Sequence, residues 1–212
     1  MSVREEILAR IRSRLGREGV YGQPAPAGNE TGPPPRPVVG DDLVGHFTAK
    51  AEAIAATVEV VESPGRVPRA IAAYLEAKRL AREATTGDDP WLAAMPWADA
   101  GLDVTVRHPR EAGLVGVSHA VFAVAETGTV VLASGADNPV TLNYLADYHI
   151  VVVERSRVVA FQEQVWATFR EVGMPRALCF ISGPSRTGDI EFDIQLGAHG
   201  PRNLHVIIVD PK

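Results

Sequence analysis

Residues 149–154, His-Ile-Val-Val-Val-Glu, are the stretch of sequence that decides the fold. Their apolar, β-branched centre is typical of a strand buried on both faces of a parallel sheet. A helical pattern precedes this run over residues 139–146, and another follows it over residues 158–172, where apolar residues recur every three or four positions. A buried strand between two helices indicates an α/β protein.

The same alternation extends in both directions along the chain. Helical patterns begin at Leu43 and after Ser63-Pro64, and a short one spans residues 90–98. A short break, Glu126-Thr127-Gly128, separates two β-rich runs and predicts a hairpin or sharp corner. We expect one mostly parallel sheet with helices on both faces. Its remaining strands are predicted at residues 58–61, 80–84, 104–106, 115–125, 129–133, 177–182 and 204–209.

An N-terminal appendage precedes the α/β domain. Residues 1–18 contain a predicted amphipathic helix, over residues 2–16, with apolar residues at every fourth position. Residues 19–40 form a linker that is rich in proline and glycine and too polar to order itself by burial. The α/β domain is predicted over residues 41–212. The arginines of the helix are interpreted either as a solvated face that complements the helix dipole or as a docking arm for an acidic partner.

Charge and cysteine content exclude several classes of function. The 212 residues carry a formal net charge of −5, so nucleic acid is not an expected partner. The single cysteine, Cys179, can form no internal disulfide and cannot supply the roughly four thiolates of an iron–sulfur cluster. No apolar run has the length of a membrane span and no secretory leader is recognised, so we expect a soluble, cytoplasmic protein.

The break between the two β-rich runs is the first candidate for chemistry. Glu126 lies between apolar segments, where an unpaired charge is costly to bury. Gly128 can adopt positive φ or admit a ligand close to the backbone. The corner is therefore either a functional carboxylate beside a ligand or a hairpin turn with a solvated glutamate.

A polar loop after the strand at residues 177–182 is the second candidate. Such strand-end loops bind ligands in open α/β sheets. Gly183 gives the backbone conformational freedom, and the planar guanidinium of Arg186 can bind a carboxylate or phosphate with two hydrogen bonds. The spacing Gly183-x4-Gly188 is similar to a phosphate loop, but Asp189 stands where that motif has lysine, so a nucleoside-triphosphate site is rejected. The alternative is a Gly-Pro turn with a helix cap at Ser185 and an internal Arg186–Asp189 ion pair.

His199 is the third candidate, because flexible glycines hold it just before the last strand and its pKa suits proton transfer near neutrality. A lone histidine in a turn is also a common structural residue. The six histidines show no metal-ligand spacing, so no metal site is predicted. A Gly-x-Ser-x-Gly nucleophile elbow and a Gly-x-Gly-x-x-Gly dinucleotide motif are both missing from the sequence.

Three segments together resemble the LUD domain family: residues 125–129, residues 183–191 and residues 197–206. One departure is Gly188, where the family usually has alanine. The resemblance implies a fold similar to the sugar-phosphate isomerase and CoA-transferase (NagB/RpiA-like) group. It also implies a role in using L-lactate together with two iron–sulfur partner proteins, which would carry the clusters that this chain lacks. CoA transferases of similar fold place a catalytic glutamate in a Glu-x-Gly corner, which Glu126-x-Gly128 resembles.

The leading hypothesis is an accessory or substrate-handling component that supports oxidation of L-lactate to pyruvate. In it, Glu126 and His199 are the catalytic candidates that position or move a proton. The alternative is a free-standing CoA-transferase-like or isomerase-like enzyme with Glu126 as nucleophile. A third hypothesis is a non-catalytic assembly module tethered by the N-terminal helix. Residues expected around a small carboxylate ligand are Thr127, Gly128, Thr129, Gly183, Ser185, Arg186, Thr187, Asp189 and Glu191.

Overall fold

The structure is a computed structural model that describes residues 3–14, 36–107, 109, 112–187, 195–196 and 200–211. The chain divides into two units, Met1–Pro37 and Val38–Lys212. The first unit contains helix α1 (Val3–Arg14), and its apolar residues Val3, Ile7 and Ile11 are exposed. All other elements belong to the second unit.

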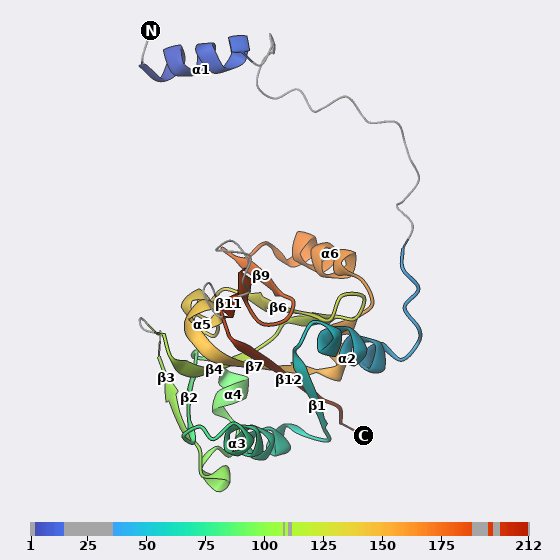
Figure 1. The fold of residues 1–212 in the computed structure, drawn as a ribbon. Coiled ribbons are helices and arrows are strands. Elements are labelled where there is room, and N and C mark those ends of the chain that lie inside the picture. The colour runs from blue at the N-terminus through green and yellow to red at the C-terminus, as the bar shows by residue number, and fades with distance from the viewer. Residues whose placement is uncertain are drawn as a thin grey trace. The chain divides into compact units, whose positions relative to one another are not determined.

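A six-stranded sheet, in which every paired neighbour is parallel, forms the centre of the second unit (Figure 1). The strand order is β1-β12-β7-β4-β2-β3. Residues 149–154 lie in β7, which pairs with β4 on one side and β12 on the other. The bounds are β1 (Thr57–Val61), β2 (Glu83–Thr86), β3 (Asp103–Val106), β4 (Leu114–His119), β7 (Ala146–Glu154) and β12 (Asn203–Val209).

A second, four-stranded sheet has the order β8-β5-β6-β9. Strands β5 and β6 form the predicted antiparallel hairpin, β6 also pairs antiparallel with β9, and β8 runs parallel to β5. A two-stranded antiparallel ribbon, β10 with β11, follows β9. The bounds are β5 (Phe122–Val124), β6 (Thr129–Ala133), β8 (Val158–Val159), β9 (Leu178–Ile181), β10 (Arg186–Thr187) and β11 (Gln195–Leu196).

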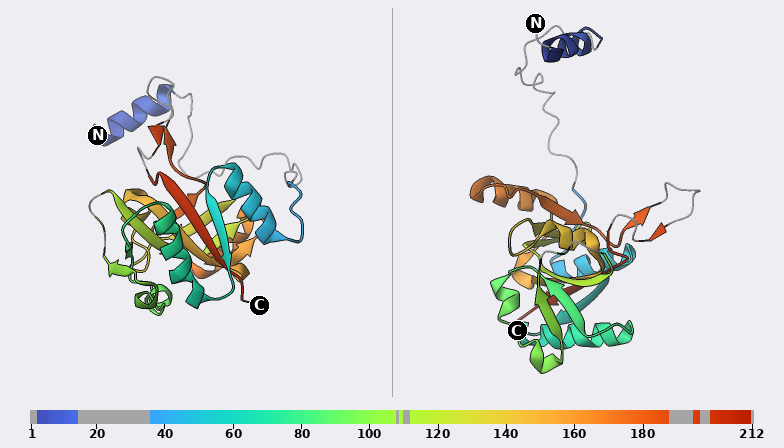
Figure 2. Two further views of the ribbon diagram at one scale, coloured as in Figure 1. Left: turned by 60° about the horizontal axis from the view of Figure 1, so that its bottom comes forward. Right: turned by 90° about the vertical axis from the view of Figure 1, so that its left-hand side faces the viewer.

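The helices and the two sheets are stacked in layers (Figures 1 and 2). Helices α3 and α4 cover one face of the large sheet, where Ile71, Leu75 and Leu92 are fully buried. Helix α2 and the small sheet cover much of the other face, and α6 covers the far face of the small sheet. The bounds are α2 (Leu43–Ala53), α3 (Val67–Ala77), α4 (Pro90–Ala93), α5 (Val140–Leu145) and α6 (Gln162–Val172), with 3-10 turns at Pro64–Arg66, Ala98–Ala100 and Arg155–Arg157.

The α/β class and the mostly parallel sheet are confirmed, but some predicted element bounds are wrong. The apolar run 115–125 is two strands, because the chain leaves the large sheet at Ala120, which bonds to Val152, and joins the small sheet at Val121, which bonds to Val131. The helix expected from residue 158 begins at Gln162, since Val158 and Val159 pair with β5. The predicted helix on the second face of the large sheet is α2, and the small sheet covers this face beside it.

Candidate functional site

The Glu-Thr-Gly corner is the turn between β5 and β6, and Val124 and Thr129 close it as the last paired residues. Gly128 has a φ of +65°, in the left-handed region that favours glycine. It lies against α2, so that a Cβ at this position would stand 2.4 Å from the backbone nitrogen of Ala51. Only glycine therefore lets the corner approach the backbone of α2 this closely.

A chain of hydroxyl groups joins this corner to the polar loop after β9. The Thr127 and Thr129 Oγ1 atoms are 2.7 Å apart, and Thr129 Oγ1 is 2.6 Å from Ser182 Oγ. Thr129 is buried, whereas Ser182 is exposed. The two sequence segments predicted to form one site thus lie side by side.

The loop after β9 is anchored at two further places. Gly183 has a φ of +77°, and a Cβ on it would stand 2.5 Å from the Ile54 carbonyl oxygen at the end of α2. The Ser185 backbone N–H donates to the Pro201 carbonyl at 2.7 Å, just before β12. The corner and the loop therefore rest on the same end of α2, and the loop also contacts the segment that leads into the last strand.

Glu126 and Arg186 have different surroundings. The half-buried Glu126 accepts, through Oε1, a hydrogen bond from the backbone N–H of Gln162 at 3.0 Å, and its own N–H donates to Ala160. Its carboxylate thus binds the first residue of α6, where a negative charge stabilises a helix. Arg186 begins β10 and is exposed. No hydrogen bond or ion pair joins Glu126 to Arg186 among the described residues.

The structure describes only some of the remaining predicted site residues. Thr187 continues β10 and pairs with Gln195. Asp189, Glu191 and His199, together with Gly188, lie outside the described residues. In the part of the chain that is described, no group of three or more His, Cys, Asp or Glu side chains could hold a metal ion.

The topology of the large sheet marks a second site that the sequence analysis missed. The connection from β2 leads outward to its neighbour β3, whereas the connection from β4 leads the other way, through the small sheet, to β7. Adjacent parallel strands whose connections diverge leave a crevice at their carboxyl ends, which is the usual ligand site of open α/β sheets. Asp89 follows β2 and His119 ends β4, so both lie at the carboxyl ends of these two strands.

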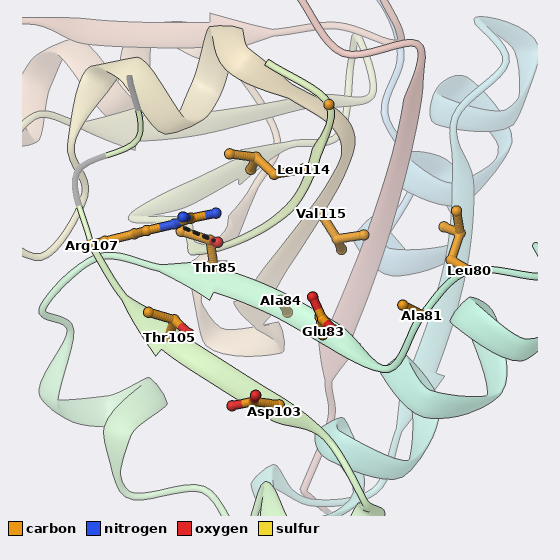
Figure 3. Close-up of a pocket in the computed structure, with 11 residues that line it drawn as sticks. Leu80, Ala81, Glu83, Ala84, Thr85, Asp103, Thr105, Arg107, Leu114 and Val115 are labelled. Carbon is orange, nitrogen blue, oxygen red and sulfur yellow. Dashed lines mark hydrogen bonds between the residues drawn. The ribbon is translucent and has the colours of Figure 1, made fainter. Parts of the chain in front are cut away.

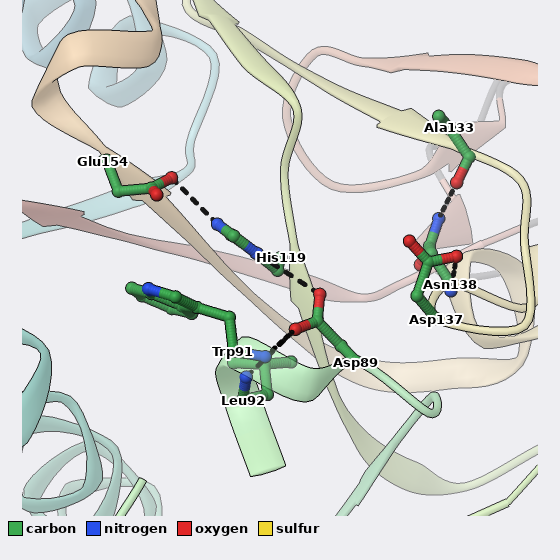
Figure 4. Close-up of polar contacts among 8 residues, drawn as sticks. All are labelled: Asp89, Trp91, Leu92, His119, Ala133, Asp137, Asn138 and Glu154. Atoms are coloured by element: carbon green, nitrogen blue, oxygen red, sulfur yellow. Dashed lines mark hydrogen bonds and ion pairs between the residues drawn. The ribbon is translucent and has the colours of Figure 1, made fainter. Parts of the chain in front are cut away.

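His119 is held between two carboxylates at this point (Figure 4). Its Nδ1 is 3.2 Å from Asp89 Oδ2, and its Nε2 is 2.8 Å from Oε2 of Glu154, the last residue of β7. The indole of Trp91 stacks on the imidazole with ring centroids 4.2 Å apart. The other oxygen of Asp89 caps α4 by accepting from the N–H groups of Trp91 and Leu92. We call these four residues, Asp89, Trp91, His119 and Glu154, the histidine clasp.

Electrostatics favour the charged forms within the histidine clasp. Burial opposes ionisation of His119, but the hydrogen bonds to Asp89 and Glu154 outweigh it and raise the pKa of the imidazole. Burial likewise opposes ionisation of Asp89, but His119 and the amides of α4 outweigh it and lower the pKa of that carboxyl. The histidine clasp therefore ties the ends of β2, β4 and β7 together through the two ring nitrogens of His119. The one sequence signal that could have indicated this cluster is Asp-Asp-Pro at residues 88–90, which is typical of a helix N-cap.

Comparisons with known proteins agree with the fold. A lactate utilization protein C of Deinococcus radiodurans is 37% identical over 125 residues, which cover 54% of this chain and 58% of that protein. One from Anoxybacillus flavithermus is 32% identical over 97 residues, or 45% of this chain and 44% of that protein. The matched region spans about half the length of the curated relatives. The likeness to sugar-phosphate isomerases and CoA transferases stays a prediction.

A solved structure gives an independent match. The crystal structure of a DUF162 family protein from Deinococcus radiodurans has a TM-score of 0.59 and 26% sequence identity, and the match covers 82% of this chain and 99% of that one. The model of the LUD domain family matches residues 44–209, nearly all of the second unit. With that match over most of its length, the chain belongs to the LUD domain family.

Proposed function

We propose that this protein is a component of an L-lactate utilisation system and supports the oxidation of L-lactate to pyruvate. The names of its relatives support a role in lactate utilisation. None of the helices that the structure describes is long and apolar enough to cross a membrane. The lactate-handling role, the partners and the site residues below are parts of the same proposal.

The observation that carries the proposal is the convergence of the Glu-Thr-Gly corner with the loop after β9. The Thr129–Ser182 hydrogen bond, 2.6 Å long, brings hydroxyl groups of both segments to one place. Hydroxyls and glycine backbone N–H groups are donors that suit a small carboxylate. Arg186, exposed at the start of the ribbon that continues this loop, supplies the planar fork for the carboxylate of the ligand.

Proton handling falls to Glu126 or His199 in this proposal. Removing two electrons from L-lactate also releases two protons, so a base near the hydroxyl is required. One Glu126 oxygen is bound to the Gln162 N–H, which fixes the carboxylate at the edge of the corner. The same bond engages one of the two oxygens of the carboxylate that the CoA-transferase alternative would use as its nucleophile. A carboxylate that is held in place in this way supports the proposed proton handling.

The electrons leave through partner proteins in this proposal. These 212 residues contain one cysteine, the half-buried Cys179, whereas an iron–sulfur cluster normally takes about four thiolates. The chain would hold and orient the substrate, and iron–sulfur clusters on the partners would accept the two electrons. No cofactor is assigned to the chain itself.

A gene-replacement experiment in the native host tests this function. Deleting the gene should abolish growth on L-lactate and leave growth on glucose intact, and the wild-type gene should restore it. Arg186→Gln should restore growth poorly, because the carboxylate loses its fork, whereas the control Arg170→Gln, exposed on α6, should restore it fully. A tagged copy from lactate-grown cells should co-purify with iron–sulfur proteins.

Two results would contradict the proposal. Unchanged growth of the deletion strain on L-lactate would remove the role in lactate utilisation. A covalent acyl adduct on Glu126, trapped with acyl-CoA and detected by mass spectrometry, would replace it with the CoA-transferase alternative.

A further inference from the structure

A polar pocket of about 340 Å³ lies on the large sheet beside its edge strand β3 (Figure 3). Its polar lining comes from β2 and β3 and from the residue that follows β3: Glu83, Thr85, Asp103, Thr105 and Arg107. It is separate from the Glu-Thr-Gly corner and from the histidine clasp, with which it shares no residue.

The sheet surface at this pocket is unlike the rest of the parallel sheet. Parallel sheets are normally covered on both faces and lined by apolar residues. Here the neighbouring strand β4 is covered by α5, whose Leu142 would stand 3.0 Å from a Cβ on Gly116. On β2 and β3, however, Glu83, Asp103 and Thr105 alternate along the strands and are exposed. Apolar residues, among them Leu114 and Val115, also line the pocket, but its charged side chains on β2 and after β3 suit a charged ligand.

Arg107 forms the basic end of the pocket. Its Nε donates a hydrogen bond of 3.2 Å to Oγ1 of Thr85, which is only 3% exposed. Figure 3 shows the side chain reaching from the end of β3 across to β2. The bond uses Nε of Arg107 and leaves both terminal nitrogens of the guanidinium for a ligand. Among the described residues, no carboxylate lies within ion-pair distance of these two nitrogens. A guanidinium oriented in this way matches a carboxylate with two parallel hydrogen bonds.

Glu83 and Asp103 form the acidic end. They are paired residues of two adjacent strands, and their side chains lie on the same face of the sheet. Like charges directly opposite each other destabilise a sheet. Among the described residues, neither carboxylate has a cation within ion-pair distance. A cationic group placed between them would remove this repulsion.

The basic and acidic ends of the pocket lie in neighbouring rows of side chains, two residues apart along the strands. Thr85 pairs with Thr105 in the row beneath the Arg107 side chain, and Glu83 pairs with Asp103 in the next row of the same face. Two residues of a parallel strand span about 6.6 Å. A molecule with a carboxylate and an ammonium on one carbon is of a size to bridge two such neighbouring rows through hydrogen bonds to each end.

We propose that this pocket binds a free α-amino acid as a zwitterion, with its carboxylate on Arg107 and its ammonium group between Glu83 and Asp103. L-lactate has the carboxylate but carries a neutral hydroxyl in place of the ammonium group, so this site discriminates against the substrate of the proposed function. The test of this site is therefore independent of the test of the proposed function.

Titration of the ¹⁵N-labelled protein with L-alanine, followed by amide chemical shifts, tests the proposal. L-alanine should shift the amides of β2 and β3 with millimolar affinity, and L-lactate, its analogue with a hydroxyl in place of the ammonium, should bind there at least about tenfold more weakly. Arg107→Gln and the double variant Glu83→Gln/Asp103→Asn should each weaken L-alanine binding by about tenfold or more. The control Glu163→Gln, exposed on α6, should leave it unchanged.

The variants change exposed side chains, so unchanged thermal unfolding and unchanged shifts far from β2 and β3 should confirm that each one folds. Equal affinity for L-alanine and L-lactate would overturn the proposal, as would full L-alanine affinity in the double acidic variant. The absence of L-alanine shifts on β2 and β3 up to about 50 mM would overturn it too.

Discussion

Gly128→Ala is the substitution that tests most sharply how the Glu-Thr-Gly corner is seated on α2. Gly128 combines a φ of +65° with close packing, because an added Cβ would stand 2.4 Å from the Ala51 nitrogen and 2.7 Å from its Cα. Both contacts are with helix backbone, which cannot rotate aside as a flexible side chain can. The chain offers a matched control in Gly101, which has a φ of +66° and whose added Cβ would meet only the flexible Arg82 side chain, at 3.5 Å.

The magnitude has two parts. A left-handed conformation costs an alanine about 1 kcal/mol relative to glycine. Forcing a methyl group into a packed backbone contact costs about 1–3 kcal/mol more. We therefore expect Gly128→Ala to lower the free energy of unfolding by about 2–4 kcal/mol, a large share of the 5–15 kcal/mol typical of a domain. Gly101→Ala should cost about 1 kcal/mol, since only the left-handed backbone conformation is unfavourable there.

Urea denaturation followed by far-UV circular dichroism measures both variants against the unsubstituted protein. The slope of free energy against urea should stay constant, so that the change in midpoint reports stability alone. If Gly128→Ala were no more destabilising than Gly101→Ala, the corner would not be packed on α2 as described. The reasoning that the corner and the loop share one support would then fail.

Two further predictions concern titratable groups. His119→Leu leaves the carboxylates of Asp89 and Glu154 without their shared imidazole partner and should lower the free energy of unfolding by about 2–4 kcal/mol. Part of this loss should be regained in His119→Leu/Glu154→Gln, and equal stability of wild type and single variant in urea would refute the prediction. Burial lowers the pKa of His149 and of His205 to about 4. The unfolded chain therefore takes up two protons below about pH 6.5 that the folded chain does not, and stability should fall by up to about 2.7 kcal/mol per pH unit on acidification. The raised pKa of His119 acts in the other direction, since its contribution is complete below about pH 6.5 and is lost as the pH rises through the folded-state value. Urea midpoints should therefore peak near neutrality, and midpoints that rise steadily toward pH 4 would contradict the assignment.

The long apolar runs made the centre of the fold predictable. Residues 149–154 and 204–209 lie in β7 and β12, which are buried on both faces and pair with each other. Their composition alone excludes a surface position, so local pattern and final place agree. The hairpin at residues 126–128 was predictable for a similar reason, since a glycine interrupts two β-branched runs.

Features decided by distant partners were not predictable. Nothing local marks the point where the chain leaves the large sheet between Ala120 and Val121, because both residues suit a strand and only their partners, Val152 and Val131, differ. The pattern at Val158 suits a helix as well as a strand, and pairing with β5 decides it. Tertiary context overrides local preference at such positions.

The same limit applies to the candidate sites. The sequence indicated the corner and the loop as candidate sites because each carries glycine and polar residues in a compact motif. The histidine clasp was missed because Asp89, His119 and Glu154 are each more than 25 residues apart in the sequence, with hydrogen-bond separations of 30 and 35 residues. Only the order of the parallel strands brings their carboxyl ends together.

Amide chemical-shift mapping with L-lactate tests the central claim most directly, because it asks whether the two segments respond to one ligand. The account predicts saturable shifts at Gly128, Thr129, Ser182 and Gly183 together, which Arg186→Gln weakens and Arg170→Gln leaves unchanged. Shifts confined to one of the two segments, or to neither at saturating L-lactate, would contradict it.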